Sequence, residues 1–155
     1  MSYVKETIKL LIDTFPESSF NVVKNDWIKN IENQYSVIPI NLKSLYNELG
    51  YGTIGDGYYS IHVLLEPEEI YDPETAKNLT GKLIVGDDFA GNCHAYDAQD
   101  NWSFGYVNCN GEFEKLEDYY SDFIDYLNKL CQNEKSWINK EPATNKGLQQ
   151  LGVEG

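Results

Sequence analysis

The spacing of apolar residues changes twice along this chain, and these changes constrain the fold more than any single motif does. Between residues 4 and 49, apolar side chains recur every three or four positions, as they do on one face of an α-helix. Pro16 interrupts this pattern and Gly50 ends it. We therefore expect three helices, over residues 4–15, 25–35 and 39–49.

A two-residue period, typical of β-strands, replaces the helical period after residue 57. In the first such stretch, residues 58–65, we expect Ile61, Val63 and Leu65 to share one face. Turn-forming residues separate the apolar runs that follow. The further expected elements are strands over residues 81–88, 93–98 and 103–109, a helical turn within 66–78, and a final helix over 115–131.

The order of these elements predicts the fold class. Helices come first, consecutive strands follow and a helix closes the chain, an order that favours an α+β fold with a mostly antiparallel sheet over alternating βαβ units. The chain has 155 residues, enough for one domain with its own core. We expect this domain over residues 1–135, followed by a loosely held polar tail over residues 136–155.

The charge of the chain narrows the choice of partner. The formal net charge is −13, from 25 acidic and 12 basic residues, and every basic residue is a lysine. Arginine supplies the planar fork that grips phosphate groups, and this chain has no arginine. A nucleic-acid-binding protein is therefore not expected. A partner with a basic surface is the natural complement. The alternative is that the acidity serves solubility alone.

The expected compartment is the cytoplasm. The N-terminal segment lacks the pattern of a secretory signal, and no apolar run approaches the length of a membrane span. We therefore expect no membrane association. The three cysteines, Cys93, Cys109 and Cys131, are expected to be reduced thiols.

Residues 83–113 bring two cysteines, a histidine and several aspartates together in sequence, as a metal or catalytic site would. Neighbouring strand residues point to opposite faces, so Cys93 and His94 are not expected to ligate one zinc ion. The acidic turn lacks the alternating ligands and closing glutamate of a calcium loop. No cysteine has the spacing from His62 or His94 that would indicate a nucleophile with its base. We expect no catalytic residue, no metal and no cofactor.

Three segments match a known family in their order and spacing. Residues 38–57, IPINLKSLYNELGYGTIGDG, combine a proline-led helix with a glycine-rich break. Residues 83–99, LIVGDDFAGNCHAYDAQ, form two strands around a Gly-Asp turn, and residues 118–130, DYYSDFIDYLNKL, form a closing helix. Together they resemble the SUKH superfamily, the Smi/Knr-like proteins. The chain departs from the family where Leu49-Gly50 replaces the usual Asn-Gly pair, and in its C-terminal tail.

The resemblance implies an α+β fold, no catalytic residues and a binding role. Many bacterial members are immunity proteins that neutralise the toxin domain of a competing or neighbouring cell. The expected function is therefore that of a non-catalytic immunity protein that occludes a cognate toxin. Eukaryotic members act as regulatory scaffolds, so a regulatory interaction module is an alternative. A third hypothesis, of another class, is an enzyme with an unrecognised cysteine or carboxylate site.

The densest run of acidic residues indicates where a basic partner would bind. Between Asp87 and Asp125, ten acidic residues stand against one lysine, a net charge of −9. Acidic residues in turns are expected to be exposed, and aromatic residues near them are suited to anchor a partner. The expected partner-binding residues are Asp87, Asp88, Asp97, Asp100, Trp102, Tyr58 and Tyr59.

Overall fold

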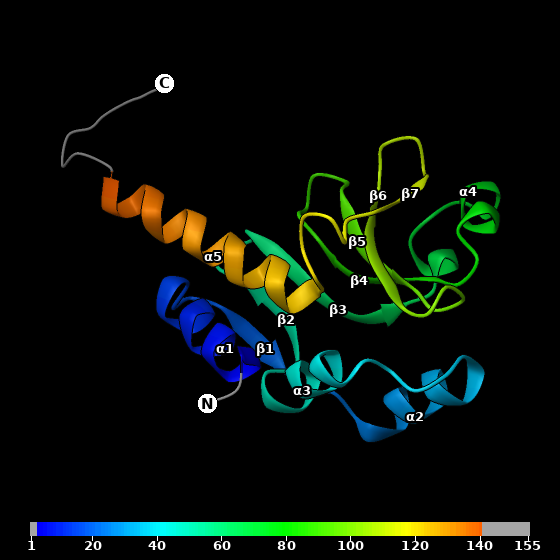
Figure 1. Cartoon of the computed structure of the whole chain (residues 1–155), viewed down its shortest axis with the longest axis horizontal. Coiled ribbons are helices and arrows are strands. Elements are labelled where there is room, and N and C mark those ends of the chain that lie inside the picture. Colours follow the sequence, from blue (N-terminus) through cyan, green and yellow to red (C-terminus); the bar gives the residue numbers. More distant parts are fainter. Residues whose placement is uncertain (1–2, 141–155) are drawn as a thin grey trace.

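The computed structural model describes residues 3–140, with side chains as far as Glu134. This part of the chain consists of N-terminal helices, an antiparallel sheet and a C-terminal helix (Figure 1). The helices are α1 (Tyr3–Thr14), α2 (Asn25–Gln34), α3 (Ile40–Glu48), the 3-10 helix η1 (Pro67–Glu69), α4 (Pro73–Asn78) and α5 (Phe123–Lys140). The strands are β1 (Ser19–Asn21), β2 (Tyr51–Ile54), β3 (Tyr59–Leu65), β4 (Lys82–Asp87), β5 (Cys93–Asp97), β6 (Ser103–Val107) and β7 (Phe113–Lys115). The predicted α+β fold class is confirmed.

The sheet is a meander in which every strand pairs antiparallel with the next one along the chain, in the order β1-β2-β3-β4-β5-β6-β7. Its register decides which turns are neighbours. Asp87 at the end of β4 pairs with Cys93 at the start of β5, whereas Asp97 at the end of β5 pairs with Ser103. The β4–β5 and β5–β6 turns therefore lie at opposite ends of the sheet.

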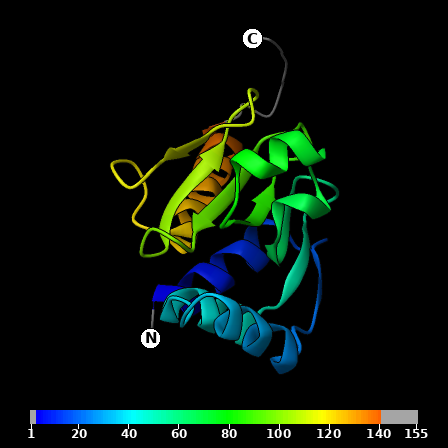
Figure 2. The ribbon, with the colours of Figure 1, turned by 90° about the vertical axis from the view of Figure 1, so that its right-hand side faces the viewer.

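Helices cover both faces of the sheet. Helices α1, α3 and α5 pack against one another on one face, and Figure 2 shows the sheet between α5 and the α4 segment. The larger core lies under these three helices; its buried members include Leu11, Leu45, Ile61, Phe104 and Leu127. A smaller cluster lies on the α4 face and consists of Leu79, Ile84, Cys93, Ala95 and Val107.

Strand β3 changes the face of its side chains at a bulge. Leu64 has a φ of 43°, and the pairing register with β4 shifts between Ile61 and Leu65. Ile61 and Leu65 are four residues apart but pair with Gly86 and Ile84, which are two residues apart, so the strand alternation is broken between them. Ile61, Val63 and Leu64 pack in the larger core, while Leu65 packs against the smaller cluster. The prediction that Ile61, Val63 and Leu65 share one face is therefore wrong for Leu65.

Three short strands were not predicted. The glycine-rich stretch read as a break contains β2, whose Gly52 lies so close to the backbone of β1 that a Cβ atom would collide with Ser19. Lys115, the first residue of the predicted final helix, belongs to β7, and residues 116–122 form turns and irregular structure, so α5 begins at Phe123. The backbone of α5 then continues to Lys140, past the predicted domain limit at residue 135. Most of the predicted tail, residues 141–155, lies outside the described residues. Within residues 3–140, no helix has both the length and the apolar character needed to cross a bilayer.

Candidate binding groove between α2 and β3

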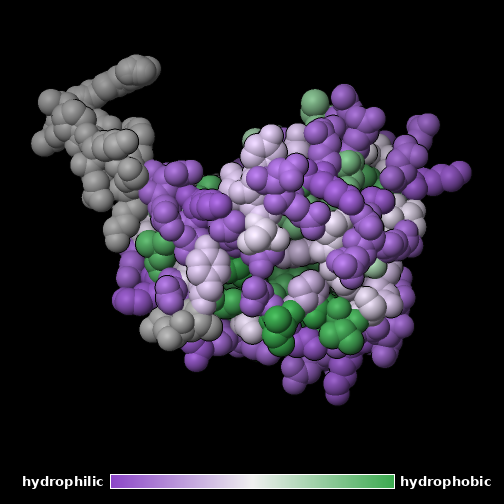
Figure 3. All heavy atoms as spheres, in the orientation of Figure 1, coloured by the Kyte–Doolittle hydropathy of each residue, from purple (hydrophilic) through white to green (hydrophobic). Residues whose placement is uncertain are grey.

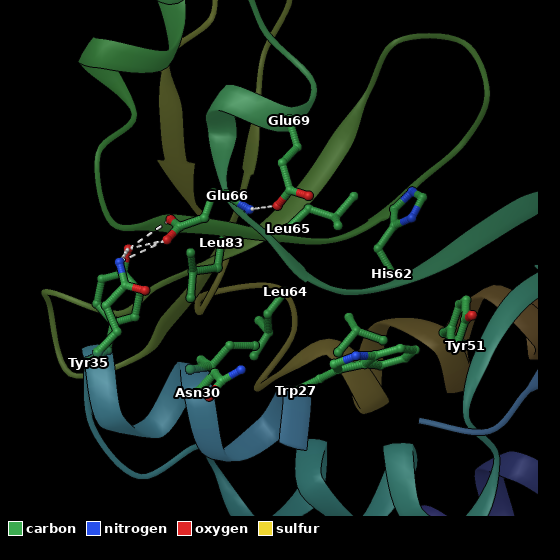
Figure 4. Close-up of a pocket in the computed structure, with 13 residues that line it drawn as sticks. Trp27, Asn30, Tyr35, Tyr51, His62, Leu64, Leu65, Glu66, Glu69 and Leu83 are labelled. Carbon is green, nitrogen blue, oxygen red and sulfur yellow. Dashed lines mark hydrogen bonds between the residues drawn. The ribbon is translucent and has the colours of Figure 1, made fainter. Parts of the chain in front are cut away.

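A groove with a volume of about 460 Å³ opens between α2 and the second half of β3 (Figure 4). Leu64 of β3 and Leu83 of β4 line it from the sheet, and Trp27 and Ile31 line it from α2. Three successive residues around the bulge in β3, Val63, Leu64 and Leu65, all belong to the lining of the groove. The result is an apolar floor between a helix and a sheet.

Trp27 forms an aromatic wall of the groove. The buried Ile28 anchors α2 in the larger core, and Trp27 beside it remains 36% exposed. The indole meets the Tyr51 ring of β2 edge to face, with a centroid distance of 5.8 Å. The ammonium group of Lys24 lies 5.7 Å from the indole centroid, so this ring already attracts one cation.

The carboxylates of Glu66 and Glu69 lie at the end of the groove opposite Tyr51. The Tyr35 hydroxyl donates to both carboxylate oxygens of Glu66, at 2.8 and 2.9 Å, and Gln34 Nε2 donates to one of them at 3.1 Å. Glu69 accepts the backbone N–H of Glu66 at 2.9 Å. Burial, followed by the hydrogen bond to Glu66, raises the pKa of Tyr35 well above its ordinary value. Tyr35 therefore stays a neutral donor that orients the Glu66 carboxylate.

The charge of Glu66 and Glu69 is not balanced by a neighbouring cation. None of the ion pairs found among the residues with described side chains includes either of them. The groove lining contains no lysine, and its one histidine, His62, pairs through Nε2 with Asp87. The groove thus combines an apolar floor and aromatic walls with a net negative end.

The predicted partner-binding residues near the β4–β5 turn are less accessible than expected. Tyr58 is 39% exposed, but Tyr59 is only 1% exposed, and its hydroxyl lies 2.7 Å from His94 Nδ1. Tyr59 is therefore a core residue and not a surface anchor. Asp87 and Asp88 were expected to be exposed, yet both are half-buried.

The two turn acids have structural partners that account for their burial. Asp87 pairs with His62 and accepts the Phe89 N–H at 2.9 Å. Asp88 accepts the N–H groups of Ala90 and Asn92, so it closes the β4–β5 turn. Burial acts to raise the pKa of Asp88, but the hydrogen bonds from Asn92 and Ala90 hold it below its usual value. Both side chains are used to shape the turn.

The other predicted residues lie at the opposite end of the sheet. Asp97 is buried and lies 3.4 Å from the Lys82 ammonium, which corrects its expected place on the surface. Asp100 is exposed, and its ion pair with Lys115 at 2.6 Å holds its pKa below the usual range. Trp102 is half-buried and donates from Nε1 to Ser36 Oγ at 2.8 Å. The predicted residues therefore form two separate groups instead of one surface.

The sequence does not predict the groove residues. Trp27, Ile28, Ile31 and Tyr35 recur at helical spacing and together span an apolar face of ordinary width, so the pattern does not separate the exposed Trp27 from the buried Ile28. The acidic run around Pro67 lies in the segment predicted to contain a helical turn, and nothing in its spacing connects it with Trp27.

The reactivity of the three cysteines depends on their burial. All three are free thiols, and Cys93 and Cys131 are buried while Cys109 is exposed. Burial raises the pKa of Cys93, and it raises that of Cys131 to about 11, so both thiols are held in the less nucleophilic protonated form. Among the described residues, no three or more His, Cys, Asp or Glu side chains are arranged to hold a metal ion.

Comparison with protein-family models, with curated proteins and with solved structures finds no match for this chain. The kind of ligand that suits the groove is therefore inferred from its lining residues. An apolar floor with a few converging polar groups is the usual form of a binding site. Here the polar groups include two carboxylates, which suit a ligand with an apolar part and a cationic part.

Proposed function

We propose that this chain is a non-catalytic binding protein of the cytoplasm, an immunity protein that neutralises a cognate bacterial toxin by occluding it. The observation that carries the proposal is the open groove between α2 and β3, apolar and aromatic inside and negative at one end. Such a surface suits the binding of a basic protein better than a reaction. The resemblance to the SUKH superfamily, many of whose bacterial members are immunity proteins, supports the same function.

The distribution of exposed charge supports a basic partner. The exposed acids of the segment with net charge −9 lie mainly along β7 and the connection to α5, and those around Lys115 are Glu112, Glu114, Glu117 and Asp118. A toxin that acts on nucleic acids carries a basic cleft for the phosphate backbone. A negative surface is complementary to such a cleft and would accelerate the encounter of the two proteins.

Exposed apolar side chains beside α2 and α3 also favour an interface. Val37, in the connection between these helices, is 72% exposed, and Ile40 at the start of α3 is 73% exposed. Figure 3 shows hydrophobic side chains gathered over the α2 and α3 region, on a face that is otherwise largely hydrophilic. Large apolar residues grouped on a surface mark interaction sites more often than residues scattered singly do.

The proposal is tested in two steps, identification and protection. The tagged chain is used to capture its partner from the cell that makes it, and mass spectrometry identifies the captured protein. The captured domain is then expressed in a bacterial host, alone and together with the chain. We expect growth arrest by the domain alone and normal growth on co-expression. A captured domain that is harmless alone would favour the regulatory alternative, and one that remains toxic on co-expression would contradict neutralisation.

A further inference from the structure

The groove between α2 and β3 has the features of a receptor for one side chain. Its floor is formed by Leu64 and Leu83, and the Trp27 indole stands beside it (Figure 4). Glu66 and Glu69 lie together at the end of the groove opposite Tyr51. Neither takes part in any ion pair found among the residues with described side chains. A ligand that fills this groove must offer an apolar stem and a terminal positive charge.

The Glu66 carboxylate is held in place before any ligand arrives. Three hydrogen-bond contacts from the Tyr35 hydroxyl and the Gln34 amide fix its orientation, and both donor groups are neutral. These donors satisfy part of its hydrogen-bonding capacity without cancelling its charge. A carboxylate that is already oriented loses little conformational entropy when it binds a cation.

We infer that the groove binds a lysine or arginine side chain of the partner protein, with the alkyl stem over Trp27 and Leu64 and the cationic head at Glu66 and Glu69. Long basic side chains bury their stems on apolar surface while the charged head remains at a polar site. The Trp27 ring offers the alkyl stem an aromatic surface to pack on, while Glu66 and Glu69 attract the charged head. That the cation belongs to a protein rests on the proposed function, whereas the preference for a cation rests on the groove alone.

The test uses small probes that share one apolar tail and differ in charge. 4-Phenylbutylamine is cationic at neutral pH, and 4-phenylbutan-1-ol is its neutral counterpart. Each is titrated into the full chain labelled with ¹⁵N, and the Trp27 indole N–H signal, assigned with a Trp27→Phe variant, reports binding. We expect the amine to bind roughly fivefold more tightly than the alcohol at low salt, as befits a partly exposed charge pair. The preference should shrink as salt rises.

Matched variants locate the source of the preference. Glu66→Gln keeps the shape of the side chain and its ability to accept from Tyr35, so we expect it to fold and to lose most of the preference for the amine over the alcohol. Glu69→Gln serves as a second variant and should lose part of the preference. The control Glu6→Gln, on the exposed face of α1, should leave the preference unchanged. Equal binding of amine and alcohol to the wild-type chain, or the same preference in Glu66→Gln, would overturn the inference.

The outcomes separate this inference from the proposed function. If the captured domain is neutralised but the groove shows no preference for the amine, the toxin is bound through another surface and the inference fails alone. If the amine is preferred but no toxic domain is captured, the groove remains a cation receptor and the proposed function fails.

Discussion

A buried histidine shows how far the surroundings of one residue can depart from its sequence context. His94 is 8% exposed, and its ring lies 4.1 Å from that of Tyr126 and 5.9 Å from that of Phe104. Tyr59 supplies a hydrogen-bond partner for Nδ1. The desolvation of the ring lowers the pKa of His94 to about 4, even though Asp88 acts to raise it. The folded state therefore favours the neutral imidazole.

Replacing His94 should flatten the pH dependence of stability in mildly acidic solution. Because the pKa of His94 is lowered in the folded state, the neutral ring contributes fully to stability above about pH 6.5. This contribution is lost as the pH falls towards 4, because the unfolded chain then binds a proton that the folded chain does not bind. The loss attributable to this residue is on the order of 3 kcal/mol. Urea unfolding of the wild type and of His94→Gln, which cannot titrate, should show the smaller loss between pH 7 and 4 in the variant. Equal losses would contradict the buried neutral state.

Gly86 is required because Tyr59 lies across it. A Cβ atom on Gly86 would collide with the Tyr59 ring and hydroxyl, while the backbone of Gly86 is not in the left-handed region. We expect Gly86→Ala to lower the free energy of unfolding by about 1–3 kcal/mol through overpacking. In a double-mutant cycle, Tyr59→Leu should relieve part of this penalty, because the shorter side chain no longer reaches Gly86. Strictly additive effects would place the strain elsewhere.

At the scale of elements, periodicity predicted what is long and regular. The helices α1, α2 and α3 and the strands β3 to β6 lie where the apolar spacing places them. The strands β1, β2 and β7 have three or four residues each, too few for a period to emerge, and they are held by their neighbours in the sheet. The bulge at Leu64 was not predictable, since it depends on the pairing of β3 with β4 and not on local sequence.

The groove could not be predicted for a related reason. It joins α2 to β3 and η1, which come later in the chain, after α3 and β2, so no local pattern connects Trp27 with Glu66. The predicted acids failed as a site because charge along the sequence does not reveal which carboxylates the turns use, as Asp88 illustrates. Composition favours a basic partner, and the three-dimensional structure was needed to locate the groove.

The contact between the end of α2 and the start of η1 should contribute to stability. The Tyr35 hydroxyl donates to the charged Glu66 in a half-buried position. Removing it in Tyr35→Phe should lower the free energy of unfolding by roughly 1–3 kcal/mol, the range for a hydrogen bond to a charged group. The exposed Tyr119, at 71% exposure, provides the matched control, and Tyr119→Phe should change stability by less than about 0.5 kcal/mol. Equal effects in chemical denaturation would show that the bond is not formed.

For the whole molecule, the acidity has two distinct uses. Half-buried or buried acids such as Asp87 and Asp97 shape turns and pair with His62 and Lys82. Exposed acids such as Glu117 have no such structural use, and together they give the surface a strong negative field. We therefore expect exposed acids to govern the rate of association with a basic partner, and Glu66 in the groove to govern the lifetime of the complex.

This division predicts different effects for two charge-reversal variants. Asp88→Lys should destabilise the β4–β5 turn, because lysine cannot accept the N–H groups of Ala90 and Asn92. Glu117→Lys should leave the thermal midpoint nearly unchanged and slow association with the captured toxin domain, an effect that high salt should remove. Thermal unfolding and stopped-flow mixing check the two halves. An unchanged association rate for folded Glu117→Lys at low salt would leave the exposed acidity to solubility alone.

The proposed binding of a toxin through the acidic groove is tested most directly by one dissociation constant. It is that of the captured toxin domain for Glu66→Gln, compared with that for the wild type. Calorimetric titration of the wild type, Glu66→Gln and the control Glu6→Gln gives all three values under one condition. We predict at least roughly tenfold weaker binding for Glu66→Gln, since a cation left facing a neutral amide loses a desolvated charge pair. Glu6→Gln should bind like the wild type. Equal affinity of folded Glu66→Gln and the wild type would contradict binding through the groove.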